Sequence, residues 1–364
     1  MISRIIAWSA RNLLLVLFGA SFAAAAGFYA LVHLPLDAIP DLSDTQVIVY
    51  TEYSGQAPQV IEDQVTYPLA TAMLTVPKSK VVRGFSFFGV SFVYVIFEDG
   101  TDIYWARSRV LEFLNSASSR LPSGVSPTIG PDATGVGWVY QYAVMSKELN
   151  LAETRTLQDW NLKFALAKAE GVAEVAGIGG FVKQYNVILD PQRMRDRGIT
   201  MQKMREAIRA SNTDVGGRTV ELSEFEYVIR GKGYLKSIND LGNIVLKTNN
   251  GTPVQLRDVS RIELGPDERR GITELNGEGE VASGIVLQRF GVNALSVIEN
   301  VKKRFREIAT SLPKSVEIVP VYDRSNLIYA AIDNLSIRFS RKALSSLWYV
   351  SYFFCMSAAL SSRF

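Results

Sequence analysis

The sequence predicts an α/β membrane protein: one N-terminal transmembrane helix, then periplasmic ferredoxin-like αβ subdomains that carry an inserted αβ subdomain. Three observations lead to this prediction. Residues 12–36 contain no Asp, Glu, Lys or Arg. Beyond them, strand-like and helix-like patterns alternate, and that order occurs twice. The second occurrence is interrupted between residues 182 and 270 by a stretch with strands of its own.

The N-terminal apolar segment is long enough to cross a bilayer. As a helix, residues 12–36 would span about 37 Å at ~1.5 Å per residue, against a hydrocarbon layer of ~30 Å. We therefore predict a transmembrane helix over residues 13–34. Arg4 and Arg11 precede it and acidic residues follow it, which places the N-terminus in the cytoplasm and the bulk of the chain in the periplasm. The alternative is a signal peptide cleaved near residues 23–26.

The first αβ pattern occupies residues 47–122, with the order β-α-β-β-α of a ferredoxin-like unit. A four-residue apolar repeat predicts its first helix, and Pro68 should kink or break that helix. Thr101 is the expected N-cap of the second helix. The predicted elements are a strand at 47–53, a helix at 57–76, two strands within 81–97 that separate at Gly89, and a helix at 103–121.

The second pattern predicts strands at 136–145, 172–178, 281–290 and 316–322, with helices at 156–168 and 294–312. The interrupting stretch has predicted strands at 185–189, 226–230, 243–248 and 253–257, and a helix that Thr200 caps and that runs to Ser211. Asn250-Gly251 is a hairpin-turn signal between its last two strands.

Composition excludes several classes of function. The net charge is +3, from 39 basic and 36 acidic residues, which argues against a general nucleic-acid binder. One cysteine, Cys355, and one histidine, His33, rule out an intramolecular disulfide, a zinc site of the Cys/His type and a nucleophilic triad. No Walker motif is present. We therefore predict no enzyme activity, no catalytic residue, no cofactor and no metal-ligating set in this chain.

Several long collinear stretches resemble the heavy-metal efflux branch of the resistance-nodulation-division transporters, over about residues 1–335. They are LPLDAIPDLSDTQVIVYTEYSGQAPQVIEDQVTYPL (34–69), VRGFSFFGVSFVYVIFEDGTDIYWARSRVLEFL (82–114), GPDATGVGWVYQYA (130–143), LQDWNLKF (157–164), GGFVKQYNVILDPQRM (179–194), RRGITELNGEGEVASG (269–284) and VYDRSNLIYAAIDNL (321–335). The DATGVGWVYQYA stretch is similar to the copper/silver type of this branch rather than to the zinc/cobalt/cadmium type.

The resemblance implies a domain organisation. It implies a cytoplasmic start and transmembrane helix at 1–36, porter subdomain one at 42–133, porter subdomain two at 134–181 and 271–330, and a docking subdomain insert at 182–270. It also implies a bacterial inner-membrane protein. In the intact family a homotrimer joins a periplasmic adaptor and an outer-membrane channel and exchanges protons for metal cations, here Cu⁺ or Ag⁺ in preference to Zn²⁺, Co²⁺ or Cd²⁺.

Arg83 is the one site residue that the resemblance suggests, near the periplasmic cleft that admits metal. A cation at that place would tune entry rather than bind the ion. The alternative is an ordinary surface arginine held in a salt bridge. Neither interpretation makes Arg83 a metal ligand.

Two other groups of side chains invite a metal interpretation. Met194, Met201 and Met204 carry thioethers that suit Cu⁺, but methionine also fills gaps in helix packing, and we favour packing. Asp37, Asp41 and Asp44 are hard-cation ligand types, but prolines lie among them and we expect an exposed connector that leaves the membrane instead.

After Leu335 the resemblance ends. Residues 336–364 are rich in serine, and residues 343–362 carry no charge, so we expect an aberrant tail that inserts weakly in a membrane. A shifted reading frame would explain the change. The family's proton-relay carboxylates lie further along, so the prediction is a truncated exporter that does not transport by itself. The alternative is a membrane-anchored periplasmic scaffold that docks to pump or adaptor subunits; the metal-type motifs argue against a multidrug exporter.

Overall fold

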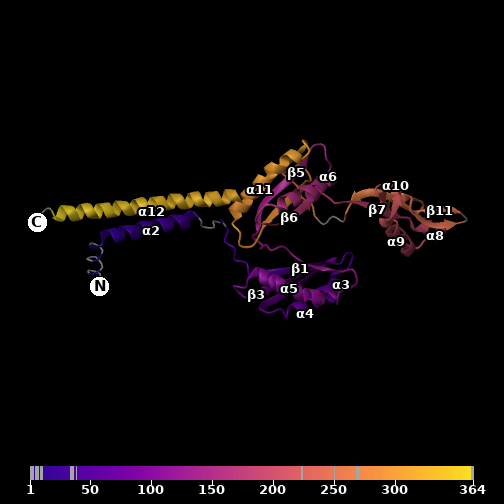
Figure 1. Cartoon of the computed structure of the whole chain (residues 1–364), viewed down its shortest axis with the longest axis horizontal. Coiled ribbons are helices and arrows are strands. Elements are labelled where there is room, and N and C mark those ends of the chain that lie inside the picture. The colour runs from indigo at the N-terminus through magenta and orange to yellow at the C-terminus, as the bar shows by residue number, and fades with distance from the viewer. Residues whose placement is uncertain are drawn as a thin grey trace. The chain divides into compact units, whose positions relative to one another are not determined.

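The computed structural model describes residues 4, 8, 11–32, 37, 39–222, 224–249, 251–267 and 271–361 (Figure 1). The chain divides into two compact units. The first contains residues 1–143, 161–177 and 284–364, and the second contains residues 144–160 and 178–283.

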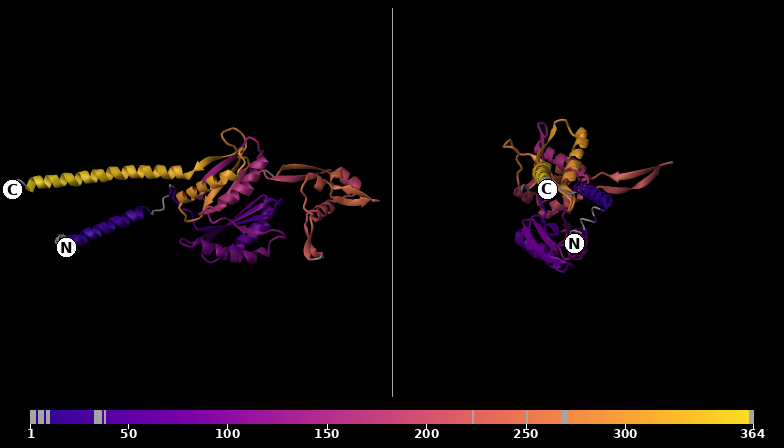
Figure 2. Two further views of the ribbon diagram at one scale, coloured as in Figure 1. Left: turned by 45° about the horizontal axis from the view of Figure 1, so that its top comes forward. Right: turned by 90° about the vertical axis from the view of Figure 1, so that its left-hand side faces the viewer.

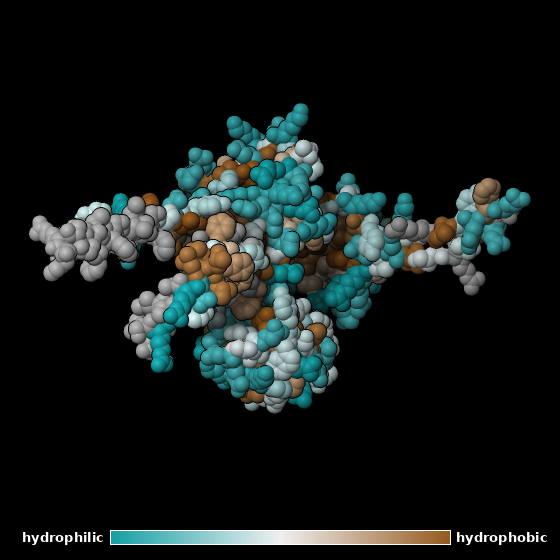
Figure 3. Space-filling model, turned by 60° about the vertical axis from the view of Figure 1, so that its left-hand side comes forward, coloured by the Kyte–Doolittle hydropathy of each residue, from teal (hydrophilic) through white to brown (hydrophobic). Residues whose placement is uncertain are grey.

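Helix α2 (Leu13–Val32) forms the predicted apolar span. In the described part of the chain, its stretch from Leu13 to Ala30 is the one helical segment long and apolar enough to cross a membrane, and none of it is buried. Its apolar side chains form a mostly brown surface in Figure 3. A helix that is apolar on all sides and uncovered suits a lipid environment better than water. Residues 33 and 34, the end of the predicted helix, lie outside the described residues.

The first sheet has four strands in the order β2-β3-β1-β4, and each neighbouring pair is antiparallel. Its strands are β1 (Gln46–Glu52), β2 (Ser79–Phe87), β3 (Val90–Phe97) and β4 (Pro127–Ile129). The prediction missed β4, because three residues beginning with a proline carry no periodicity. With β4 included, the strand order is that of a ferredoxin-like fold.

Helices cover one face of the first sheet (Figure 1). They are α3 (Pro58–Ile61), the π-helical turn η1 (Glu62–Thr66), α4 (Tyr67–Met73) and α5 (Ile103–Ser118). The predicted stripe Ile61, Val65, Leu69 and Met73 is fully buried in their shared core. Pro68 was predicted to kink or break the helix, and the chain stays helical through Pro68 to Met73. A π turn precedes Pro68, and the widened hydrogen bonding there accommodates the missing N–H.

The N-cap of α5 is one residue later than predicted. The Asp102 side chain accepts a hydrogen bond of 2.8 Å from the backbone N–H of Trp105. Thr101 instead donates its hydroxyl to the carbonyl of Glu98 at 2.7 Å. The carboxylate is the stronger acceptor for a helix N-terminus, and Thr101 closes the preceding turn.

The second sheet has the order β14-β5-β13-β6, which repeats that of the first when the strands are numbered along the chain. Its elements are β5 (Trp138–Ser146), α6 (Leu151–Leu157), the π turn η2 (Gln158–Leu162), α7 (Lys163–Ala167), β6 (Val172–Gly179), β13 (Ala282–Gln288), α11 (Ala294–Ile308), the 3-10 turn η4 (Ala309–Ser311) and β14 (Val316–Asp323). Phe305 of α11 packs edge-on against Tyr142 of β5, with ring centroids 4.9 Å apart.

Helix α6 begins five residues before the predicted start at 156. Asn150 accepts from the backbone N–H of Glu153, and Glu153 accepts in return from the backbone N–H of Asn150. This capping box satisfies N–H groups that the first helical turn leaves free.

The stretch between β6 and β13 has its own small core. Its elements are β7 (Lys183–Leu189), α8 (Pro191–Arg197), α9 (Met201–Ala210), β8 (Val215–Leu222), β9 (Phe225–Gly231), α10 (Ile238–Gly242), β10 (Val245–Asn249), β11 (Thr252–Gln255), the 3-10 turn η3 (Leu256–Asp258) and β12 (Ser260–Pro266). Strands β8 and β12 and helices α8 and α10 were not predicted. Gly251 adopts a positive φ at the predicted hairpin turn, while Asn250 lies outside the described residues.

Helix α12 (Arg324–Ser361) is one uninterrupted helix in its described part (Figure 2). It passes through Leu335 without a break, although the resemblance ends there. Its 38 residues correspond to about 57 Å at ~1.5 Å per residue. The predicted weak membrane insertion of residues 343–362 stays a prediction.

Candidate functional site

Arg83 lies on β2, on the face of the first sheet that the helices leave open. The strand register places it beside Tyr94 of β3, which in turn lies beside Ile48 of β1. The alternating residues Val93 and Val49 are fully buried on the helical side. Because successive side chains of a strand point to opposite faces, Arg83 projects from the open face.

Aromatic rings surround Arg83 on this surface, which we call the aromatic face and define by Tyr50, Phe85, Phe87, Phe92 and Tyr94. Phe85 meets Tyr94 edge-on at 5.4 Å between centroids. Phe92 lies 6.0 Å from Phe87 and 5.2 Å from Tyr50. A shallow groove follows the rings, and its lining is Gln46, Arg83, Phe85, Phe87, Phe92, Tyr94 and Ile96.

The Arg83 guanidinium is exposed and makes no ion pair or hydrogen bond to any residue that the structure describes. The salt-bridged alternative therefore finds no partner among those residues. A fixed positive charge repels cations and attracts carboxylates, which disfavours a metal ligand at Arg83 itself.

Strand β2 is held closely against the π turn at Arg83. A Cβ on Gly84 would lie 2.5 Å from Cγ2 of Thr66, so glycine is required for this approach. The Thr66 hydroxyl lies 2.8 Å from the Ser91 hydroxyl and accepts from Ser86 at 2.8 Å. These buried hydroxyls satisfy one another, and they fix β2 and β3 to the helical layer.

Sequence reasoning missed the aromatic face, although a signal was present. The β3 segment VSFVYVIF is apolar at nearly every position rather than at alternate ones. Such a run is typical of a strand buried on both faces. Helices cover one face of the first sheet, so the pattern indicates that its aromatic face is built to meet another surface.

The acidic connector after α2 is exposed, as predicted, and two of its carboxylates have bonding partners. Asp37 pairs with Arg324, with 3.1 Å between Oδ1 and Nε. Asp41 accepts from the Thr134 hydroxyl at 2.7 Å. Burial alone would raise the pKa of Asp41, but the hydrogen bonds from Thr134 and Ser43 lower it overall. Asp37 and Asp41 bond to different partners, which disfavours a shared cation site.

The described residues hold no group of three or more His, Cys, Asp or Glu side chains placed to share a metal ion. Met204 is buried in the small core of the second unit, and Met194 packs against that core. Met201 is 52% exposed and does not share the buried position of Met204. The contacts of Met194 and Met204 agree with the packing interpretation, and Met201 lies at the surface.

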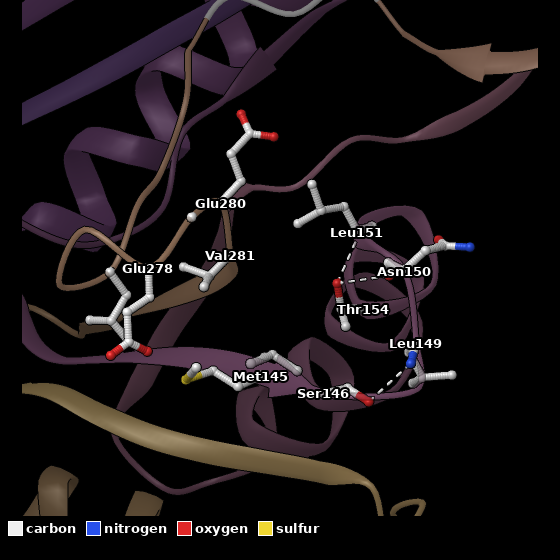
Figure 4. Close-up of a pocket in the computed structure, with 12 residues that line it drawn as sticks. Met145, Ser146, Leu149, Asn150, Leu151, Thr154, Glu278, Glu280 and Val281 are labelled. Carbon is white, nitrogen blue, oxygen red and sulfur yellow. Dashed lines mark hydrogen bonds between the residues drawn. The ribbon is translucent and has the colours of Figure 1, made fainter.

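A pocket in the second unit lies between the end of β5, the start of α6 and the loop before β13 (Figure 4). Met145 and Thr154 line one side, and Glu278 and Glu280 line the other. The two carboxylates point in different directions in Figure 4. They do not converge on a common point, and we assign no ligand to this pocket.

Comparison with known proteins agrees with this architecture. The model of the AcrB/AcrD/AcrF family matches residues 5–340. The cation efflux system protein CusA of Escherichia coli K12 is 56% identical over 339 residues, which cover 92% of this chain and 32% of CusA. The cobalt-zinc-cadmium resistance protein CzcA of Cupriavidus metallidurans is 35% identical over 341 residues, covering 91% of this chain and 32% of CzcA.

A crystal structure of a heavy metal efflux pump superposes with a TM-score of 0.80 at 34% identity, over 89% of this chain and 32% of that one. The chain thus spans about a third of the length of the relatives it matches. The family model covers most of the chain, and the structural match shows the same fold. The chain therefore belongs to the AcrB/AcrD/AcrF family and resembles its heavy-metal efflux members.

Proposed function

We propose that this chain forms the N-terminal part of a proton-driven heavy-metal exporter of the bacterial inner membrane. The observation that carries the proposal is the collinear 56% identity to a cation efflux protein over 339 residues. Helix α2 would cross the membrane with the N-terminus in the cytoplasm, and the two sheets and the insert would lie in the periplasm.

The subdomain assignment follows the repeated strand order. Residues 42–133 would be porter subdomain one, and residues 134–181 with 271–330 would be porter subdomain two. Residues 182–270 would be the docking subdomain. The support is that two sheets of identical strand order occur, and that the second is assembled from segments on either side of the insert.

The proposed cargo is Cu⁺ or Ag⁺. Identity to CusA, at 56%, is well above the 35% identity to the relative named for cobalt, zinc and cadmium resistance. Soft monovalent cations prefer thioether and thiolate ligands, so the ligands that hold the cargo would come from another part of the full exporter.

In this proposal Arg83 lies beside the path by which the cation enters. Its charge, without a partner among the described residues, would act on the entering cation by repulsion and would disfavour binding along the aromatic face. The aromatic face itself would pack against a further part of the full exporter.

The full exporter would act as a homotrimer with a periplasmic adaptor and an outer-membrane channel. Residues 1–364 on their own would not export metal, because the family resemblance places the proton-relay carboxylates in helices that follow this region. Intramembrane carboxylates of that kind mark ion pathways.

Metal tolerance in an efflux-deficient bacterium tests the proposal. The chain would be expressed alone, and also fused at residue 335 to the remaining two thirds of Escherichia coli CusA. We expect the fusion, and not the chain alone, to raise tolerance to copper and silver. Arg83→Ala in the fusion should change the tolerance, whereas the control Arg193→Ala, which removes a surface ion pair to Asp190, should not.

Two results would contradict parts of the proposal. Full tolerance from residues 1–364 alone would refute the claim that this region does not export metal by itself. A fusion that is stably expressed and raises tolerance to zinc or cobalt, but not to copper or silver, would refute the proposed cargo.

A further inference from the structure

Arg324 is a buried cation at the junction between β14 and α12. Its side chain is 1% exposed. Its Nη1 donates to the carbonyl of Val136 at 2.6 Å, and its Nη2 donates to the carbonyl of Ile39 at 3.4 Å. Its Nε lies 3.1 Å from Oδ1 of Asp37, an ion pair without the alignment of a hydrogen bond.

These partners come from segments far apart in the sequence. Asp37 and Ile39 belong to the connector after α2, and Val136 belongs to the linker between the two sheets, residues 130–137. Ile39 and Arg324 are 285 positions apart. A planar guanidinium has five N–H donors in a fixed fork, so one side chain can hold two carbonyl acceptors and a paired carboxylate in a defined arrangement.

Burial makes these contacts obligatory. A charged group taken out of water is tolerated when it is paired and hydrogen-bonded. If either segment moved away, the guanidinium would lose an acceptor that water cannot easily replace. The junction is therefore stable in one arrangement of the connector, the linker and the start of α12.

One neighbouring contact joins the connector to the linker, and others tie the start of α12 to α11. Asp41 of the connector accepts from Thr134 of the linker at 2.7 Å. Beside Arg324, Asp323 pairs with Lys302 of α11 at 2.5 Å and accepts from the Ser325 hydroxyl at 2.6 Å. The linker is thus joined to the connector through Thr134 and to the base of α12 through Val136.

We propose that Arg324 is a clasp. It fixes the connector after α2 and the 130–137 linker to the first turn of α12, so that these three segments form one rigid junction. The inference concerns this chain by itself and does not depend on the proposed transport.

Hydrogen–deuterium exchange on the purified full-length chain in detergent tests the clasp. Arg324→Met keeps the apolar stem and removes every donor. It should speed the exchange of amides in residues 39–45 and 130–137 by about tenfold to a hundredfold, the factor that corresponds to losing a hydrogen bond to a charged group. Peptides from β3 should exchange as in the wild type.

Two further variants sharpen the test. Arg324→Lys keeps the charge but not the fork, so it should give an intermediate increase in both segments. Arg304→Met removes an exposed guanidinium that pairs with Glu307 three residues away, and it should leave both segments unchanged. Unchanged exchange in both segments of a folded Arg324→Met protein would overturn the clasp. So would faster exchange spread evenly over all peptides, since Arg324 would then support the whole unit rather than the junction.

Discussion

The close approach of β2 to the π turn at Gly84 gives a sharp test of how the site is built. Replacing Gly84 by alanine would place the new Cβ 2.5 Å from Cγ2 of Thr66, a contact that real structures essentially never show. Thr66 is buried, and its hydroxyl is engaged with Ser91 and Ser86, so the methyl group cannot rotate away freely. The strand must therefore shift, and Arg83 would shift with it.

The magnitude follows from two opposing effects. Overpacking a well-filled core costs about 1–3 kcal/mol. Alanine in a strand recovers about 0.5–1 kcal/mol relative to glycine. Gly84→Ala should therefore destabilise the first sheet by roughly 0.5–2 kcal/mol.

Thr66→Ser removes the clashing methyl group and keeps the hydroxyl network. By itself, Thr66→Ser should lower the free energy of unfolding by about 1 kcal/mol, because one buried methyl group is lost and a small void remains. In the double variant the alanine methyl group occupies the vacated space. Its stability should return to within about 0.5 kcal/mol of the wild type, which gives a favourable coupling of roughly 1.5–3 kcal/mol between the two sites.

Hydrogen–deuterium exchange of peptides from β2 and β3 at increasing urea concentrations measures these local stabilities. Gly135→Ala is the matched control, because a Cβ there would meet nothing within 4 Å. If Gly84→Ala proves as stable as Gly135→Ala, the close approach at Gly84 does not require glycine. Additive effects of the two substitutions would refute the steric coupling.

Three further outcomes are expected. Asn150→Ala removes the capping box with Glu153 and should cost about 1 kcal/mol, measured as faster amide exchange in the first turn of α6; an unchanged rate would contradict the capping. Burial opposes ionisation of Asp323, but its bonds to Lys302 and Ser325 lower its pKa overall below 3.8. The lowered pKa in the folded state adds stability that is present above pH 3.8 and is lost as the pH falls through the folded-state pKa. The stability of Asp323→Asn, measured by acid unfolding, should therefore depend less on pH below pH 4 than that of the wild type. Two aspartates substituted into the middle of α2 should raise the free energy of membrane insertion by about 6 kcal/mol and release the chain from carbonate-washed membranes, whereas two leucines should not. If the aspartate variant stays in the membrane, α2 is not the single anchor.

Part of this protein could be predicted from residue patterns alone. The buried stripe Ile61, Val65, Leu69 and Met73 was predicted from its spacing, because a four-residue apolar repeat places side chains on one face of a helix. The break at Gly89 was predicted because a glycine between two apolar runs marks a turn, and Gly89 adopts a positive φ in the structure. The N-cap at Asp102 was misplaced by one residue, since adjacent polar side chains compete for the same helix end.

The sequence by itself determined the apolar span, the alternation of strands and helices, and which residues share a face of each element. Those properties depend on neighbours within a few residues. The tertiary structure decided that Arg83 stands among aromatic rings on an uncovered face, and that Arg324 is held by acceptors up to 285 positions away. Periodicity states which side chains lie together on one element, but it does not state what covers them. That depends on contacts between distant segments, whose free energies are set by burial and charge pairing in the folded chain.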